Sequence, residues 1–255
     1  MNASANEPMK DEFDTMPLWT AAAVQEVGPQ AAVPAGCRGS GTPAALRWLA
    51  ETMGLRPGMR LLDSGAGVGG PAELAAREYG VSPVLVDPML GACLAAARLF
   101  RRPVAVSAGE RLPFLAEAFD AAWCIGVVCT VEDQGALLAE LRRAVRHGSP
   151  VGLLVFMRTT TPLPDQPEGN HFPDLEELTT LLDQAGLQPF AQAALADFPD
   201  PPAQWQDEAG RVDAVVQRDH GHDERLRTAQ QQEEAIGRLL GEGLIVGRLL
   251  ACRAV

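Results

Sequence analysis

The sequence predicts an α/β domain built on a parallel, doubly wound sheet. From residue 59 to residue 158, apolar segments of strand length alternate with segments of helical periodicity. This alternation is typical of strand–helix–strand units in which successive strands are parallel. A glycine-rich turn at 65–70 follows the first strand and precedes a helix, which places it at the carboxyl edge of the sheet. The 255 residues, 47% of them hydrophobic, suffice for one large domain with a full core.

Each element of this core has a local sequence signal. Short apolar runs between turn residues predict strands at Met59–Asp63, Ser82–Asp87, Pro103–Val106, Ala121–Val128 and Val151–Arg158. Helical spacing of apolar residues predicts helices before and between them, at Ala44–Met53, 71–79, Leu90–Phe100 and 134–145. Thr42 and Pro43 supply an N-cap and a proline at the first helical position, so they mark the start of the first helix.

The chain before this core is expected to be only partly ordered. Residues 1–16 are polar and acidic, and we expect them to be disordered or loosely attached. An alanine-rich stretch from Pro17 to Val33 predicts a helix that ends near Gly28. Residues 34–41 are rich in glycine and are expected to form a flexible loop.

After residue 158 the sequence becomes more polar, beginning with a long irregular segment at 161–173. The elements expected beyond it are a helix at Asp174–Ala185, a strand at 188–195, a polar helical segment at 203–241 and a final strand at Leu244–Cys252. The polar helical segment is therefore an insertion between the last two strands. Insertions of this length in a compact domain usually serve the function.

Charge and composition favour a small-molecule ligand. The chain has 33 acidic and 21 basic residues, and the resulting formal charge of −12 repels phosphate backbones and anionic membranes. We therefore expect neither nucleic acid nor a membrane as partner, and a homodimer stays open. The five cysteines show no pairing typical of disulfides or zinc sites. No segment has the features of a membrane span or a signal peptide, so a soluble, cytoplasmic protein is expected.

The glycine turn admits two kinds of ligand. The spacing Gly65-x-Gly67-x-x-Gly70 satisfies the dinucleotide fingerprint, and Asp87 at the end of the second strand suits the ribose hydroxyls of either ligand. Asp63, directly before the glycines, separates the two interpretations, because a carboxylate there disfavours a pyrophosphate and favours a cationic amino group. An NAD(P)-dependent oxidoreductase is therefore the less favoured interpretation.

Four segments in order resemble the motifs of class I S-adenosylmethionine-dependent methyltransferases. Residues 62–72 resemble the first motif, in the Gly-Gly-Pro-Ala variant common among small-molecule enzymes, and residues 86–88 resemble the second. Residues 110–123 resemble the segment that closes over the adenine and enters the fourth strand. Residues 141–148 resemble the helix and turn before the fifth strand. The resemblance covers about residues 44–160.

The resemblance implies a specific architecture. The fold would be a Rossmann-like, doubly wound, seven-stranded sheet whose last strand is antiparallel, with N-terminal helices and a helical insertion before that strand. Residues 1–43 would be an N-terminal segment or lid, and 44–255 the methyltransferase domain. Within that domain, 44–160 would bind the cofactor, while 161–173 and 203–241 would cover the substrate.

The resemblance also implies S-adenosyl-L-methionine as cofactor. Asp63 would take the ammonium of its methionine portion, directly or through water, and Asp87 would accept both ribose hydroxyls. Backbone at 64–67 would lie against the methionine portion. The site residues implied in addition to these two aspartates are Ser64, Gly65, Ala66, Gly67, Pro88, Met89, Gly109, Glu110 and Cys124. One departure from the family pattern is Ala108, which stands where the family has an aspartate that contacts the adenine.

A general base is needed only when the acceptor must lose a proton. Many family members have a histidine after the fourth strand, where this chain has Cys129 and Thr130. His171, which follows the carboxyl end of the fifth strand, is the candidate base, and a surface-loop histidine is the alternative interpretation. His220 and His222 are assigned to a solvated polar segment, so no metal is expected.

The expected reaction is in-line methyl transfer to O, N or C of a small molecule, with a secondary metabolite as the expected acceptor class. The first alternative is a protein of the same fold that binds the cofactor without transferring methyl, such as a cyclase, and the second is the oxidoreductase.

Overall fold

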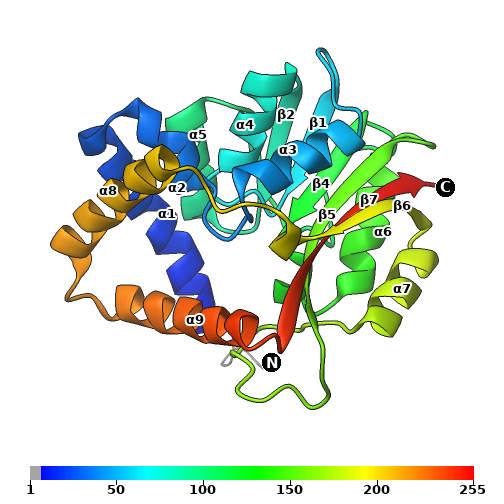
Figure 1. Ribbon diagram of the computed structural model, residues 1–255. Helices are drawn as coiled ribbons and strands as arrows, with labels where there is room; N and C mark the ends of the chain where they lie inside the picture. Colours follow the sequence, from blue (N-terminus) through cyan, green and yellow to red (C-terminus); the bar gives the residue numbers. More distant parts are fainter. Residues whose placement is uncertain (1–6) are drawn as a thin grey trace.

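The structure of this protein is a computed structural model that describes residues 7–255, with side chains from Phe13 onward. Its residues form a seven-stranded sheet with the order β3-β2-β1-β4-β5-β7-β6 (Figure 1). The strands are β1 (Arg60–Ser64), β2 (Ser82–Asp87), β3 (Val104–Val106), β4 (Ala121–Ile125), β5 (Pro150–Arg158), β6 (Leu187–Ala194) and β7 (Ile245–Ala254). The first five strands are parallel, and β7 is antiparallel to both β5 and β6. The predicted fold class is confirmed.

The α-helices of the described chain are α1 (Glu7–Val27), α2 (Ala32–Gly36), α3 (Pro43–Thr52), α4 (Gly70–Tyr79), α5 (Leu90–Phe100), α6 (Gln134–Ala144), α7 (Leu175–Gln184), α8 (Ala203–His220) and α9 (Glu224–Gly241). Local capping explains several of their ends. The Thr42 side chain accepts a hydrogen bond from the backbone N–H of Ala45, as its place before Pro43 predicts. Asp174 and Glu177 form a reciprocal capping box at the start of α7.

Helices cover both faces of the sheet. Successive strand residues point to opposite faces, and both faces are apolar, so each face packs against helices. Leu61 of β1 and Trp123 of β4 belong to the core shared with α3 and the N-terminal helices. Leu62 and Cys124 belong to the core shared with α6 and α7. Asp63, two residues after Leu61, therefore lies on the same face of the sheet as Trp123.

The structure corrects two expectations about the N-terminal region. Helix α1 begins at Glu7 and includes Pro17, so residues 7–16 are helical and not loosely attached; residues 1–6 lie outside the described range. Contact with the core stabilises this helix beyond its local propensity: α1 packs against α5, and the Gly91 N–H donates to the Asp14 carboxylate (2.5 Å).

The second correction concerns residues 34–41, expected to be a flexible loop. They include the end of the buried helix α2 and a turn held against the sheet. Gly36 and Gly70 are in backbone contact, since a Cβ on Gly70 would lie 2.3 Å from the Gly36 carbonyl carbon. The glycines expected to make this segment flexible instead permit close packing. Strand β4 also ends three residues earlier than expected, because Gly126 has a φ of 77° and a 3-10 turn begins at Val128.

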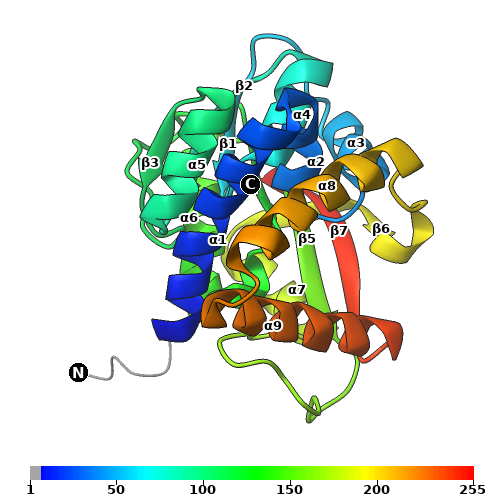
Figure 2. The ribbon, with the colours of Figure 1, turned by 90° about the vertical axis from the view of Figure 1, so that its left-hand side faces the viewer.

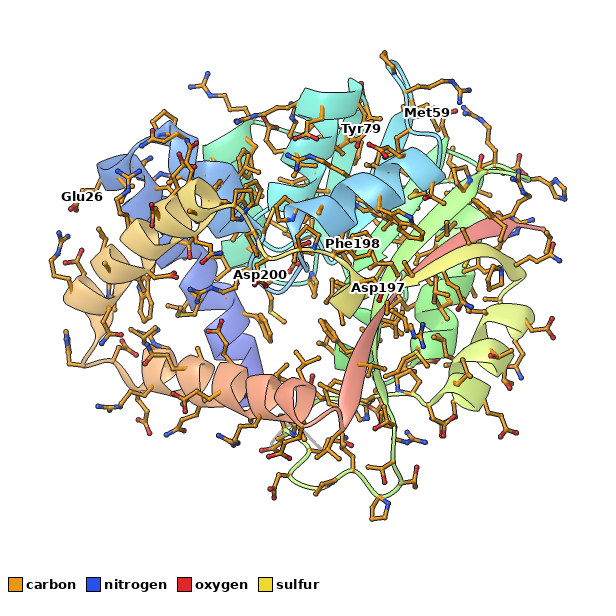
Figure 3. The ribbon with its side chains drawn as sticks, viewed as in Figure 1. Glu26, Met59, Tyr79, Asp197, Phe198 and Asp200 are labelled. Carbon is orange, nitrogen blue, oxygen red and sulfur yellow. The ribbon has the colours of Figure 1, made fainter. Side chains whose placement is uncertain are left out.

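The predicted insertion between the last two strands is formed by α8 and α9. Both helices contact α1, on the side of the molecule seen in Figure 2. The segment from β6 to α8 crosses α3, where Phe198 (Figure 3) packs on Trp48 with ring centroids 5.9 Å apart. Arg218 of α8 pairs with Glu26 of α1, and His220 stacks on Trp19 at 4.0 Å. Among the described residues, no helix is both long and apolar enough to cross a membrane.

Candidate active site

The carboxyl ends of β1 and β4 form the candidate site. The strand order changes direction beside β1, and such a position opens a crevice in doubly wound sheets. After β1 the chain turns through Gly65, Gly67 and Gly69, all with positive φ. A Cβ on Gly65 would lie 2.4 Å from Val127, whereas a Cβ on Gly67 would meet nothing within 4 Å. The turn is thus packed on one side and has open space at Gly67.

Asp87, the last residue of β2, is held in a fixed orientation. Its Oδ2 accepts from the Gly67 N–H (2.8 Å), and its Oδ1 accepts from the Met89 N–H (2.9 Å). Burial raises the pKa of this carboxyl, while the two backbone donors lower it. Each carboxylate oxygen has a second lone pair, so Asp87 can still accept from two neighbouring hydroxyls.

Asp63 is enclosed at the end of β1 with only 2% of its surface exposed. Its Oδ2 has no hydrogen-bond partner within the described structure, and the same holds for Ser64 Oγ and Trp123 Nε1. Burial raises the pKa of Asp63 to about 7. The polar indole N–H of Trp123 lowers this pKa, and the negative charge of Asp87 raises it. A buried carboxylate without a partner is costly, so this position fits a cationic group from a ligand.

The predicted adenine loop lies next to β1. A Cβ on Gly109 would lie 3.1 Å from Ser64 Oγ and 2.5 Å from Leu137. Burial raises the pKa of the Cys124 thiol, with smaller contributions from Asp63 and Glu110, so these groups are electrostatic neighbours. The structure thus brings the implied residues of β1, β2, β4 and the 107–111 loop to one edge of the sheet.

Sequence reasoning missed that residues 36–41, which we call the strap, also lie at this site. Gly36 contacts Gly70, and the Gly39 carbonyl lies against Gly126 after β4. Cys37 is buried beside Asp63, and burial followed by this carboxylate raises the pKa of its thiol. The glycines of the strap indicate that its backbone packs closely against another segment, but the sequence alone does not identify that segment.

His171 has an exposed side chain and a firmly held backbone. Its N–H donates to the Cys129 carbonyl (2.6 Å), and its carbonyl accepts from Gln134 Nε2 (2.5 Å). The structure therefore places His171 beside the turn that follows β4. His220, by contrast, lies against α1, and the described residues contain no group of three or more side chains suited to hold a metal ion.

Comparison with known proteins relates the central part of the chain to one family and the whole fold to several solved structures. Residues 62–154 match a family described as a methyltransferase domain, and no curated protein matches the chain. Three solved structures are similar in fold. The [4+2]-cyclase SpnF is 21% identical with a TM-score of 0.65, over 82% of this chain and 79% of that chain.

Geranyl diphosphate C-methyltransferase from Streptomyces coelicolor A3(2), in complex with S-adenosyl-L-homocysteine, is 18% identical with a TM-score of 0.61, over 82% of this chain and 75% of that chain. A putative sarcosine dimethylglycine methyltransferase from Galdieria sulphuraria is 16% identical with a TM-score of 0.62, over 82% of this chain and 84% of that chain. At these identities the similarity shows the fold. Residues 62–154 thus match a methyltransferase domain, and the chain has the fold of these solved structures.

Proposed function

We propose that this protein is an S-adenosylmethionine-dependent methyltransferase that acts on a small molecule, with a secondary metabolite as the expected class of acceptor. The observation that carries the proposal is the buried Asp63 carboxylate just before the glycine turn, whose Oδ2 accepts no hydrogen bond in the described structure. It fits the ammonium of the cofactor, and Asp87 on the neighbouring strand fits the ribose hydroxyls. A dinucleotide would instead bring a pyrophosphate to this carboxylate, which disfavours the oxidoreductase.

When bound, S-adenosylmethionine supplies a methyl group activated by its sulfonium. The protein's own part is to hold donor and acceptor in line and to exclude water. Ser64, Gly65, Ala66 and Gly67 provide backbone against the methionine portion. The adenine would lie among residues of the loops after β2 and β3 and of β4, namely Pro88, Met89, Gly109, Glu110 and Cys124.

His171 is the proposed base for a hydroxyl acceptor. Its backbone is anchored to Cys129 and Gln134, so its position relative to the end of β4 is fixed while its side chain stays accessible. It would take the acceptor proton as the acceptor oxygen attacks. A nitrogen or carbon acceptor that is already nucleophilic would not need it.

We also propose the division of the chain into a lid at 1–43, a cofactor-binding core at 44–160 and acceptor covers at 161–173 and 203–241. Support comes from the strap, which lies over the carboxyl edge, and from α8 and α9, which contact α1. The strap's contact with the glycine turn indicates that the lid helps to build the cofactor site as well as to cover it.

A second candidate is a protein that binds the cofactor without transferring methyl. Two observations favour keeping it: the fold is similar to that of a [4+2]-cyclase, and Cys129 and Thr130 stand where many members have a histidine. Both candidates share the cofactor site, so cofactor binding alone does not separate them.

Isothermal titration with S-adenosylmethionine, S-adenosylhomocysteine and NADPH tests the proposal. We expect micromolar binding of the first two and its loss in Asp87→Ala. Binding of NADPH alone would overturn the cofactor assignment. Methyl transfer from isotopically labelled cofactor to candidate hydroxyl, amine and activated carbon acceptors then separates the methyltransferase from the cyclase.

A further inference from the structure

Two complementary polar atoms are buried side by side without partners at the end of β1. Asp63 and Trp123 are register partners on the neighbouring strands β1 and β4, and their side chains lie on the same face of the sheet. Neighbouring strands are about 4.8 Å apart, so the two side chains are direct neighbours. Within the described chain, neither Trp123 Nε1, a donor, nor Asp63 Oδ2, an acceptor, makes a hydrogen bond of normal geometry, but the indole is near enough to Asp63 to lower the pKa of its carboxyl.

Packing alone does not explain a tryptophan at this position. Trp123 is fully buried, and a phenylalanine or leucine would fill the core without a polar atom. An indole N–H buried without an acceptor costs free energy, and so does a carboxylate buried without a donor. Both free-energy costs become smaller if the indole N–H donates a hydrogen bond to the ionised carboxylate.

Among the side chains that the structure describes, none forms an ion pair with Asp63. The titratable groups that face it are Cys37 from the strap, Cys124 on β4 and Asp87 on β2. Burial raises the pKa of Asp63 to about 7, and Trp123 acts in the opposite direction. The free protein therefore holds Asp63 between its neutral and ionised forms near neutral pH.

We propose that Trp123 is a positioning residue for the cofactor: it donates its indole N–H to the Asp63 carboxylate, and entry of the cofactor ammonium drives one proton from Asp63 to solvent. This inference rests on the proposed function. The O–H bond of the neutral carboxyl breaks, the proton goes to water or buffer, and the ammonium keeps its three protons. The bound state then pairs one carboxylate with one cation and one neutral donor.

The direction of the pH dependence follows. Above about pH 8 Asp63 is already ionised, so binding releases no proton from Asp63, and any remaining pH dependence comes from the ligand's own amino group. Below about pH 6 nearly every molecule must lose the proton, and the affinity falls roughly tenfold for each pH unit. Removing the indole donor raises the Asp63 pKa, so this transition moves to higher pH.

The first test needs no cofactor. A carboxyl ¹³C NMR titration of the free protein, assigned with Asp63→Asn, is expected to show a midpoint near 7 that moves to higher pH in Trp123→Phe. Trp48→Phe, which removes another indole next to the same core, is the matched control and should leave the midpoint unchanged. In the wild type, the Trp123 indole N–H resonance should follow the same midpoint, which decides the matter even if Trp123→Phe fails to fold. An ordinary midpoint near 4, or an unchanged one in Trp123→Phe, overturns the proposal.

The second test titrates S-adenosylhomocysteine, which carries the same ammonium, in two buffers of different ionisation enthalpy. At pH 7 we expect release of about half a proton per ligand in the wild type, more in Trp123→Phe and none in Asp63→Asn. An identical pH profile in wild type and Trp123→Phe overturns the proposal. If the wild type binds no ligand at any pH, the proposed function fails, while the NMR titration still decides whether Trp123 acts on Asp63.

Discussion

The carboxyl edge of the sheet and the α8–α9 insertion hold the same kinds of acidic side chain in opposite settings. In the insertion, Arg225 lowers the pKa of Asp223, and Arg218 pairs with Glu26 of α1 at the protein surface. At the edge, Asp63 and Asp87 are buried, and burial raises the pKa of both. Asp223 of the insertion and Glu26 of α1 thus have arginine partners. At the edge, Asp87 accepts hydrogen bonds from backbone N–H groups, and Asp63 lies beside the indole of Trp123. Both carboxylates are therefore available to a cationic or hydroxyl-bearing ligand.

This contrast shows why counting acidic residues says little about a site. The net charge of −12 disfavours partners with phosphate backbones or anionic surfaces, but it does not separate a surface ion pair from a binding carboxylate. A binding carboxylate differs from a surface ion pair because it is buried and has no basic side chain as partner. The predictions below test whether the edge and the insertion differ in function as they differ in setting.

The largest effect is expected from Asp87→Ala at the edge. It removes acceptors for both ribose hydroxyls, and two charge-assisted hydrogen bonds of about 1.5 kcal/mol each correspond to roughly a 100-fold loss of affinity. Isothermal titration with S-adenosylhomocysteine measures it. Glu26→Ala in the Arg218 pair is the matched control and should bind like the wild type. If both variants lost the same amount of cofactor affinity, the edge and the insertion would not differ in function.

His171→Ala tests the long segment that follows β5. With a hydroxyl acceptor, loss of a general base should lower kcat about 100-fold while cofactor affinity stays unchanged. Steady-state kinetics at saturating cofactor measures it, once an acceptor is known. Unchanged kcat with a hydroxyl acceptor would show that His171 is a surface residue.

Gly70→Ala tests the contact between strap and glycine turn. The added Cβ would lie 2.3 Å from the Gly36 carbonyl carbon, and such overpacking costs about 1–3 kcal/mol of unfolding free energy. Thermal and urea unfolding measure it. Gly210→Ala on α8 is the control, because a Cβ there meets nothing within 4 Å and alanine favours the helix. A Gly70→Ala protein as stable as the wild type would contradict the close contact.

The smallest effect is expected from Arg218→Ala in the insertion. Its ion pairs are exposed, and pairs of this kind contribute little to stability. We expect a melting temperature and a cofactor affinity close to those of the wild type, from calorimetry and titration. A tenfold loss of affinity would show instead that the insertion and the edge are coupled.

Local patterns predicted the elements whose signals lie within a few residues. Strand β2 and helix α5 match their predicted bounds, and Thr42 caps α3 as expected. The start of α1 was missed, because Pro17 suggested a boundary and tertiary contact with α5 overrides it.

The site was only partly predictable for a similar reason. The sequence placed Asp63 and Asp87 at one edge, because each ends a parallel strand next to a turn. It did not place Trp123 or Cys37 beside Asp63. Those neighbours depend on the register of β1 against β4 and on how the strap folds back, and neither leaves a local pattern. The roles of the site residues stay predictions.

The hydrogen bond between Asp14 and Gly91 has a consequence for the order of folding. Helix α5 has no side-chain cap from its own N-cap residue, Met89, and its first turn receives a carboxylate from a helix 77 residues earlier. A Cβ on Gly91 would lie 1.7 Å from the Asp14 carbonyl, so the two helices meet there without a side chain between them. During synthesis α1 leaves the ribosome first and can contact α2, which follows it directly, but its contact with α5 must wait until residue 91 has been made. The start of α5 is therefore completed only when it docks on a helix that is already present.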